Sequence, residues 1–138
     1  MNPLARRRLG KTEIESTQLG FGGGTLGDPY EVTSEPDAYA TMAAAYNAGI
    51  TLFDTAPWYG NTKSEHRVGQ FLRGCARDSY VLTTKVGRVY RRPDNPAEFS
   101  FPRWQGGLHF ELQFDYSRAG VLRSYEDSLQ RLGSGCAR

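Results

Sequence analysis

Residues 50–60 read ITLFDTAPWYG and carry the strongest structural pattern of the chain. Residues 50–54 form a short run, rich in β-branched and aromatic side chains, that ends in an aspartate, a pattern typical of a buried strand. Residues 17–22 and 80–86 have the same character. The sequence therefore predicts three strands, each closed by Gly, Pro or Asp.

Helical patterns separate these strands. Ser34 with Asp37 three residues later resembles a capping box, and it precedes an alanine-rich helix that stops at Gly49. Thr62 and Glu65 repeat the arrangement before a second expected helix. Both patterns place a helix start directly after a strand and its loop.

Two glycines mark the expected helix ends. Gly74 suits the left-handed position after the second helix, and Gly133 suits the same position after a third helix that begins near Arg118. The third helix is expected to place its apolar residues on one face: Val121, Leu122, Tyr125, Leu129 and Leu132.

The order strand–helix–strand–helix–strand–loop–helix predicts an α/β fold with a parallel sheet. The expected strand ends, Gly24, Asp54 and Lys85, recur about every 30 residues, the size of a βαβ unit. Parallel crossovers are right-handed, so the loops after the strands lie on one face, where such folds bind ligands. A short β-hairpin is expected ahead of the first strand, between residues 8–10 and 14–17.

A long connection, residues 87–117, follows the third strand and is rich in aromatic residues. Loops of this length are typically lids or disordered linkers, and the aromatic content argues against disorder. Two interpretations remain open at this stage: a loop that covers the substrate, and a structural flap.

Composition excludes several classes of protein. The chain of 138 residues is 38% hydrophobic and 23% charged, with a net charge of +2, which favours a globular protein and gives no argument for nucleic-acid or membrane partners. The arginines at 6–8 and those at 88, 91 and 92 are interpreted as surface charge, with phosphate contact as the alternative. No apolar run follows the first arginines as in a secretory signal, so the expected location is the cytoplasm, with reduced thiols at Cys75 and Cys136.

Three residues are candidates for chemistry at the carboxyl ends of the strands. Asp54 closes a strand, Tyr59 lies in the loop above it, and Lys85 stands at the end of the neighbouring strand. A buried lysine needs a partner, and Asp54 is the obvious one. An ammonium beside Tyr59 would favour the phenolate and make the phenol a usable proton donor and acceptor in carbonyl reduction. The alternative is a structural ion pair beside a tyrosine that only packs.

Other sites have weaker support. The chain has no nucleophile elbow, zinc-protease helix or P-loop, and no metal site is expected. The glycines at 20 and 22–24 are interpreted as letting the backbone approach a flat ligand, rather than as a dinucleotide fingerprint. His66 and His109 are expected to be surface or packing residues.

The sequence from Leu9 to about Gly133 resembles the aldo-keto reductase family. The motifs that carry the resemblance are Leu19-Gly20-Phe21-Gly22, Phe53-Asp54-Thr55-Ala56 with Tyr59-Gly60, Ser64-Glu65, Thr84-Lys85-Val86-Gly87, and Arg123-Ser124 with Ser128-Leu129-Gln130-Arg131-Leu132-Gly133. Residues 104–108 and 114–117 further resemble the branch that contains D-threo-aldose, L-fucose and pyridoxal dehydrogenases.

The resemblance implies the N-terminal portion, about three βα units, of a (β/α)8 TIM barrel. It implies NADP or NAD as cofactor and a small carbonyl compound or sugar as substrate. Asp54, Tyr59 and Lys85 would belong to a catalytic tetrad that also contains a histidine. By position, Asp54 would tune Lys85, and Lys85 would polarise Tyr59. Gly23, Gly24, Thr25 and Asp54 would lie beside the cofactor.

Two departures from the family pattern lead to further expectations. Glu13 stands where relatives usually carry a turn glycine, which would strain the hairpin if that position needs a positive φ. Residues 134–138 do not match the fourth strand that carries the family's histidine, so residues 1–133 are expected to be a partial barrel domain. Little or no activity is then expected of this chain alone, and the alternatives are a non-catalytic fragment and an accessory binding module.

Overall fold

The structure is a computed structural model that describes residues 2–100 and 103–134. Its elements in chain order are β1 (Arg6–Arg8), β2 (Glu15–Thr17), β3 (Gly20–Gly22), the 3₁₀ helix η1 (Gly23–Gly27), α1 (Glu35–Asn47), β4 (Leu52–Asp54), α2 (Lys63–Leu72), the 3₁₀ helix η2 (Arg77–Ser79), β5 (Val81–Thr83), β6 (Arg88–Arg91), β7 (Glu111–Phe114) and α3 (Arg118–Leu132).

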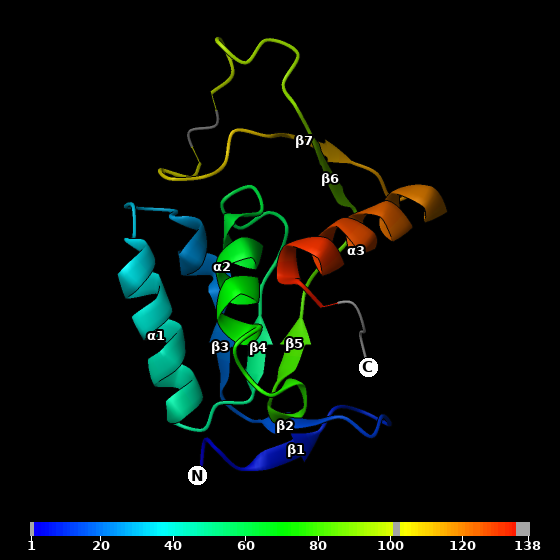
Figure 1. Cartoon of the computed structure of the whole chain (residues 1–138). Coiled ribbons are helices and arrows are strands. Elements are labelled where there is room, and N and C mark those ends of the chain that lie inside the picture. The colour runs from blue at the N-terminus through cyan, green and yellow to red at the C-terminus, as the bar shows by residue number, and fades with distance from the viewer. Residues whose placement is uncertain (1, 101–102, 135–138) are drawn as a thin grey trace.

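A parallel sheet of order β3-β4-β5 forms the centre of the molecule (Figure 1). Phe53 of β4 lies between Phe21 of β3 and Leu82 of β5 in register. The antiparallel pair β1-β2 lies at the other end of the molecule from the loops that follow these strands (Figure 1). The predicted parallel sheet and N-terminal hairpin are therefore confirmed.

The strand boundaries differ from those expected. Residues 17–22 are not one strand, because Thr17 pairs in the hairpin and β3 begins only at Gly20. The chain turns between them, where the Thr17 hydroxyl donates to the carbonyl of Leu19 at 2.7 Å. The first and third strands end at Gly22 and Thr83, earlier than expected.

The hairpin accommodates Glu13 without the strain that the sequence comparison suggested. The positive φ of this turn falls on Gly10, at 59°, and Glu13 has no positive φ. Its carboxylate accepts a hydrogen bond from Arg8 at 3.3 Å on the exposed surface. The turn glycine is therefore three residues before the position at which the sequence pattern placed it.

The helices α1, α2 and α3 lie on one face of the sheet (Figure 1). Ser34 caps α1 by accepting from the backbone N–H of Asp37 at 3.2 Å, as predicted. Between the helices and the sheet lies the core: Leu26, Ala38, Met42, Phe53, Val68, Phe71, Leu72, Tyr80 and Leu132. Burial of this apolar surface is the main force that holds the helices on the strands.

The expected capping box of α2 is wrong. Thr62 stands at the N-cap with a φ of 81°, and its side chain makes no capping bond. The carboxylate of Glu65 is fully buried and accepts instead from Arg131 at 2.6 Å and from Thr84 at 2.7 Å. An ion pair to α3 has displaced the local cap, because a buried carboxylate requires a charged partner. Gly74 is also not left-handed, whereas Gly133 is, with a φ of 65°.

The packing face of α3 differs from the apolar stripe expected. Leu132 is buried, but Leu122 and Tyr125 are exposed. The buried positions are mostly small: Gly120, Ser124, Ser128 and Leu132. Small residues allow close approach, as at Gly69 of α2, where an added Cβ would lie 2.6 Å from the Arg131 carbonyl oxygen. Backbone proximity, rather than apolar bulk, therefore fixes this helix pair.

The long connection is partly ordered as a second hairpin. Strands β6 and β7 pair in antiparallel register, with Tyr90 opposite Leu112. The sequence analysis did not predict this hairpin at the two ends of the connection. The segment between them extends over the side of the sheet on which the strands end (Figure 1).

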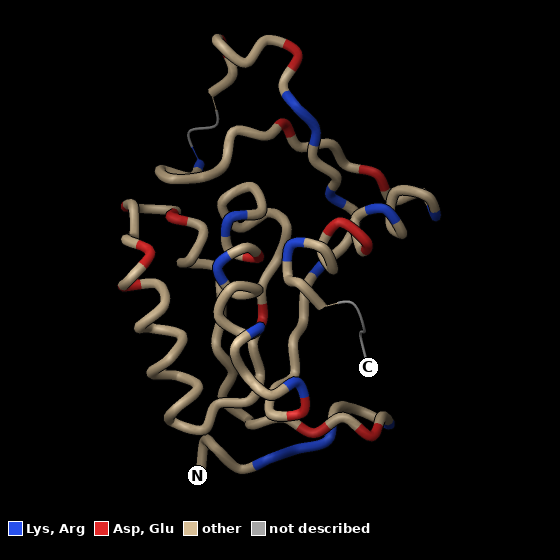
Figure 2. The backbone as a smooth tube through the Cα atoms, in the orientation of Figure 1, with Lys and Arg blue, Asp and Glu red and all other residues tan. Residues whose placement is uncertain are grey.

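Charged residues of both signs are distributed along the chain (Figure 2). The arginines of β1 lie at the end of the molecule opposite the long connection, and Arg88 is stacked on the rings of Trp58 and Phe114 at 4.5 and 5.1 Å from their centroids.

Neither α1, α2 nor α3, the α-helices of the described residues, is long and apolar enough to cross a membrane. Cys75 is a free thiol, and Cys136 lies outside the described residues.

Candidate active site

Asp54 and Lys85 form an ion pair at the carboxyl end of the sheet. The Lys85 ammonium donates to Asp54 Oδ2 at 2.8 Å and to the Thr55 carbonyl at 2.9 Å. The register partner of Asp54 is Thr83, whose hydroxyl donates to Oδ1 at 2.8 Å. Lys85 lies beyond the strand end, contrary to the sequence prediction, and reaches back to the carboxylate.

The same ammonium lies over the ring of Tyr59, with Nζ 5.0 Å from the centroid. The three predicted residues therefore come together. Partial burial alone would lower the pKa of Lys85, but the hydrogen bond and charge of Asp54, together with the Tyr59 phenol, hold this pKa above its ordinary value. The lysine was expected to be buried, yet its side chain is 49% exposed and that of Asp54 is 40% exposed. The pair faces open space because it lies at the end of the sheet.

The glycine-rich segment after β3 borders these residues. An added Cβ on Gly24 would lie 3.9 Å from Tyr59 Cζ, and Thr25 is exposed. Gly23 is buried, and its carbonyl accepts from the Ser64 hydroxyl at 2.7 Å. Thr25 is thus exposed and Gly24 is half-buried beside Tyr59, whereas Gly23 packs against α2.

Gly22 was among the glycines interpreted as letting the backbone approach a flat ligand, but it was not named among the residues beside the cofactor. It is the register partner of Asp54 on β3, it is exposed, and a Cβ built on it would meet nothing within 4 Å. A flat group can therefore approach the backbone here without steric conflict. Successive residues of a strand face opposite sides of the sheet. Because Phe21 packs against the core, Gly22 faces the other side, and this alternation could have indicated the position from the sequence.

A left-handed turn follows Tyr59. Gly60, Asn61 and Thr62 have φ values of 67°, 50° and 81°. This conformation is unusual for a β-branched threonine, and such strain concentrates at functional sites. Gly60 packs directly on Gly27, where either Cβ would clash with backbone atoms at 2.7 Å or less. The two glycines therefore lock the Tyr59 loop onto η1.

A sequence model of the Aldo/keto reductase family matches residues 18–136. The chain belongs to the aldo-keto reductase family. The pyridoxal 4-dehydrogenase of Microbacterium luteolum is 40% identical over 93% of this chain and 40% of its own length. The D-threo-aldose 1-dehydrogenase of a Pseudomonas species is 36% identical over 83% of this chain and 36% of its own. The chain thus spans about 40% of the length of these curated relatives.

Solved aldo-keto reductases have the same fold. One from Bacillus halodurans, in its holo form, is 30% identical and superposes with a TM-score of 0.69 over 94% of this chain and 37% of its own. Another, from Klebsiella pneumoniae in complex with NADPH, is 26% identical with a TM-score of 0.59 over 88% and 33%. The described elements therefore form an N-terminal part of an aldo-keto reductase TIM barrel.

Trp104 of the long connection packs on the aromatic residues that follow β4 at the carboxyl end of the sheet. The buried ring of Trp104 lies 5.4 Å from that of Trp58 and 6.3 Å from that of Tyr59, both edge-on. Leu108 N–H donates to the Gly60 carbonyl at 2.9 Å. The connection is thereby anchored beside Tyr59. His109 lies exposed in the same segment, and His66 is exposed on α2, which fits the surface positions expected.

A buried ion network, centred on Asp28, joins the connection to the scaffold. The Asp28 carboxylate is fully buried and accepts from Arg67 at 2.7 Å and from Lys63 at 2.6 Å. Lys63 also donates to the Gly106 carbonyl at 2.9 Å, and Arg67 pairs with Glu35 of α1 at 2.7 Å. The pKa of Asp28, which burial would raise, is held below its ordinary value by these bonds.

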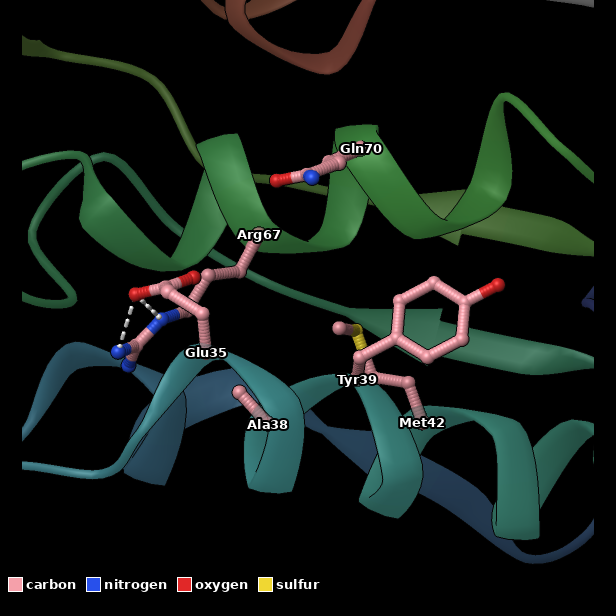
Figure 3. Close-up of a pocket in the computed structure, with 6 residues that line it drawn as sticks. All are labelled: Glu35, Ala38, Tyr39, Met42, Arg67 and Gln70. Atoms are coloured by element: carbon pink, nitrogen blue, oxygen red, sulfur yellow. Dashed lines mark hydrogen bonds and ion pairs between the residues drawn. The ribbon is translucent and has the colours of Figure 1, made fainter.

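Figure 3 shows the Arg67–Glu35 end of this network at a cavity between α1 and α2. The cavity measures about 30 Å³, which is too small for an organic ligand. It is lined by Glu35, Ala38, Tyr39, Met42, Arg67 and Gln70. This part of the network therefore serves packing between two helices, while its other end reaches Gly106 of the long connection.

Proposed function

We propose that this chain supplies the proton-transfer residues of an NAD(P)-dependent oxidoreductase, which interconverts a carbonyl compound and an alcohol. The substrate class is a small carbonyl compound or a sugar, as in the aldose and pyridoxal dehydrogenases that the chain resembles. The observation that carries the proposal is the convergence of Asp54, Lys85 and Tyr59 on the open end of the sheet.

Each residue has a role that follows from its contacts. When hydride reaches a carbonyl carbon, the oxygen gains negative charge, and the Tyr59 hydroxyl donates the proton that completes the alcohol. The nearby Lys85 ammonium stabilises the phenolate that Tyr59 becomes. Asp54 is a positioning residue, because it holds Lys85 through its Oδ2 and is itself fixed by Thr83. In the oxidative direction the phenolate accepts the proton from the alcohol.

The residues near Tyr59 fit a nicotinamide cofactor, which supplies or accepts the hydride when it is bound. Gly22 and Gly24 present backbone without side chains next to Asp54 and Tyr59, so a flat ring can lie close to them. Thr25 is exposed and offers a hydroxyl at the same edge. Gly23 contributes by packing the segment onto Ser64.

The test uses a chimera in which residues 1–133 replace the matching N-terminal segment of the Microbacterium luteolum pyridoxal 4-dehydrogenase. The chimera is expected to oxidise NADPH or NADH in the presence of an aldose or a short aldehyde, followed by nicotinamide absorbance. Tyr59→Phe should lower kcat by about 10²- to 10⁴-fold, the usual contribution of general acid–base catalysis. Lys85→Met should lower kcat by nearly the same factor.

Two controls make this test specific. Tyr30→Phe changes a tyrosine that is 87% exposed and should leave kcat unchanged. Asp54→Asn should cost less than Lys85→Met, because Lys85 keeps its bond to the Thr55 carbonyl. A folded chimera that binds cofactor but reduces no carbonyl compound, or that tolerates Tyr59→Phe, would overturn the proposal. On the 138-residue chain itself, NADP⁺ should raise the thermal midpoint.

A further inference from the structure

Two adjacent side chains in the first turn of α2, those of Ser64 and Glu65, hold the central sheet at its carboxyl end. Both residues are fully buried. Their hydrogen-bond partners are Gly23, Thr55 and Thr84, which are the first residues after β3, β4 and β5. A single turn of helix therefore fixes the backbone at the point where each of the three parallel strands ends.

The Ser64 hydroxyl links the segments after β3 and β4. It donates to the Gly23 carbonyl at 2.7 Å, and it lies 2.9 Å from the Thr55 hydroxyl. Because a hydroxyl has only one hydrogen, the Thr55 hydroxyl is the donor in the second bond. Gly24 follows one of these partners in the chain and Asp54 precedes the other, so the two site residues are connected through one buried side chain.

The Glu65 carboxylate holds the segment after β5. Its Oε1 accepts from the Thr84 hydroxyl at 2.7 Å, and its Oε2 accepts from Arg131 of α3 at 2.6 Å. Thr84 directs its side chain at α2, whereas the next side chain, that of Lys85, reaches Asp54 at the open end of the sheet. The bond between Thr84 and Glu65 therefore fixes the backbone from which Lys85 extends.

We propose that Ser64 and Glu65 are positioning residues, which set the geometry of the candidate site through the first residue after each strand. The Ser64 backbone N–H also donates to the Tyr59 carbonyl at 3.1 Å, so the same turn holds the tyrosine. A buried carboxylate requires a charged partner, so packing of Arg131 on Glu65 makes α3 part of the arrangement. The catalytic meaning of this inference rests on the proposed function, but the positioning of Lys85 can be measured without turnover.

The test measures the acetylation rate of Lys85 in the 138-residue chain, by mass spectrometry after brief treatment with acetic anhydride. The exposed Lys11 is the reference within each sample. Acetylation requires the uncharged amine; against the lowering effect of burial, the Asp54 contact raises the pKa of Lys85 and keeps it charged. Thr84→Val removes the hydroxyl and keeps the shape, and a resulting fall of about 0.5 in this pKa would raise the rate ratio about threefold. Thr84→Ser, which keeps the hydroxyl, should retain the wild-type ratio.

Thr51→Val is the matched control, because the buried Thr51 hydroxyl accepts from the Thr17 N–H at 2.9 Å just before β4, at the other end of the sheet. This variant should lose stability and leave the Lys85 ratio unchanged. A wild-type ratio in Thr84→Val, or an equal increase in Thr51→Val, would overturn the inference. Ser64→Ala gives an independent measurement if Thr84→Val does not fold: it releases Thr55, whose carbonyl accepts from Lys85, and should also raise the ratio. An unchanged ratio in Ser64→Ala would count against the inference.

The positioning inference and the proposed function fail in different ways. In the chimera with pyridoxal 4-dehydrogenase, Thr84→Val should lower kcat by up to about 10²-fold with little change in KM, and Thr84→Ser should keep the wild-type kcat. A raised Lys85 ratio in Thr84→Val, together with a folded chimera that reduces no carbonyl compound, would refute the proposed function and leave the positioning of Lys85 intact. An active chimera in which Thr84→Val changes neither kcat nor the Lys85 ratio would refute the positioning inference alone.

Discussion

Replacing Asp28 by Asn tests whether the buried ion network holds the molecule together. Asn has almost the same size and tolerates the left-handed backbone of this position, where φ is 59°. The change therefore removes the negative charge with little direct effect on the backbone. One amide nitrogen must then face either the Lys63 ammonium or the Arg67 guanidinium, and both are donors.

The size of the effect follows from the contacts that remain. Breaking one side of a buried ion pair costs about 3–5 kcal/mol, because the partner charge is left uncompensated. Arg67 is 3% exposed but keeps Glu35 and the carbonyls of Leu26 and Thr33, so the lower value applies. We expect the free energy of unfolding to fall by about 3 kcal/mol, or the thermal midpoint by about 12 °C in a chain of this length.

The assay is thermal and urea unfolding followed by circular dichroism. Asp94→Asn is the matched control, because Asp94 pairs with Arg91 on the surface with a side chain that is 82% exposed. That variant should melt within about 2 °C of the wild type, since surface ion pairs contribute little. An Asp28→Asn variant that also melted within about 2 °C of the wild type would refute the argument that the network is structural.

The same structure leads to three shorter predictions. The pKa of Asp28 is lower in the folded state than its ordinary value, so its contribution to stability is present above about pH 4 and is lost as the pH falls through the folded pKa. The thermal midpoint, measured as the pH is lowered, should therefore fall less steeply for Asp28→Asn than for the wild type. Gly69→Ala should lower the free energy of unfolding in urea by about 1–3 kcal/mol, because the added Cβ would push α3 away from α2. Gly74→Ala is the control and should be almost neutral, because a Cβ there would lie 3.4 Å from its nearest neighbouring atom. Ser34→Ala should cost about 1 kcal/mol in the same assay through loss of the α1 cap, and an unchanged midpoint would argue against that cap.

Local patterns predicted the parts of the fold that depend on neighbours in sequence. The Ser34 cap, the start of α3 at Arg118 and the left-handed Gly133 are all confirmed. Thr62 and Glu65 carry an equally good local pattern, yet Glu65 pairs with Arg131, far away in the sequence. A sequence pattern cannot show that a distant arginine is available, so the long-range ion pair was not predictable.

The candidate site was predictable in its residues more than in its geometry. Strand spacing placed Asp54 and Lys85 at one edge of the sheet, but it assigned Lys85 the register position that Thr83 occupies. Asn61 is a residue type that tolerates a positive φ, but the left-handed Thr62 had no local signal, because Thr disfavours a positive φ. Only the tertiary contacts of this turn impose that conformation. The catalytic roles of Asp54, Tyr59 and Lys85 stay predictions.

The pairing of β6 with β7 has a consequence for how members of this family can diverge. Because Arg91 stands opposite Glu111 in the ladder, residues 92–110 leave and re-enter the fold at a fixed separation. The free energy of closing such a loop changes by only about 0.6 kcal/mol when its length doubles. Insertions and replacements at residues 92–98 can therefore change the segment that extends over the carboxyl end of the sheet while the Asp54–Lys85 pair keeps its geometry.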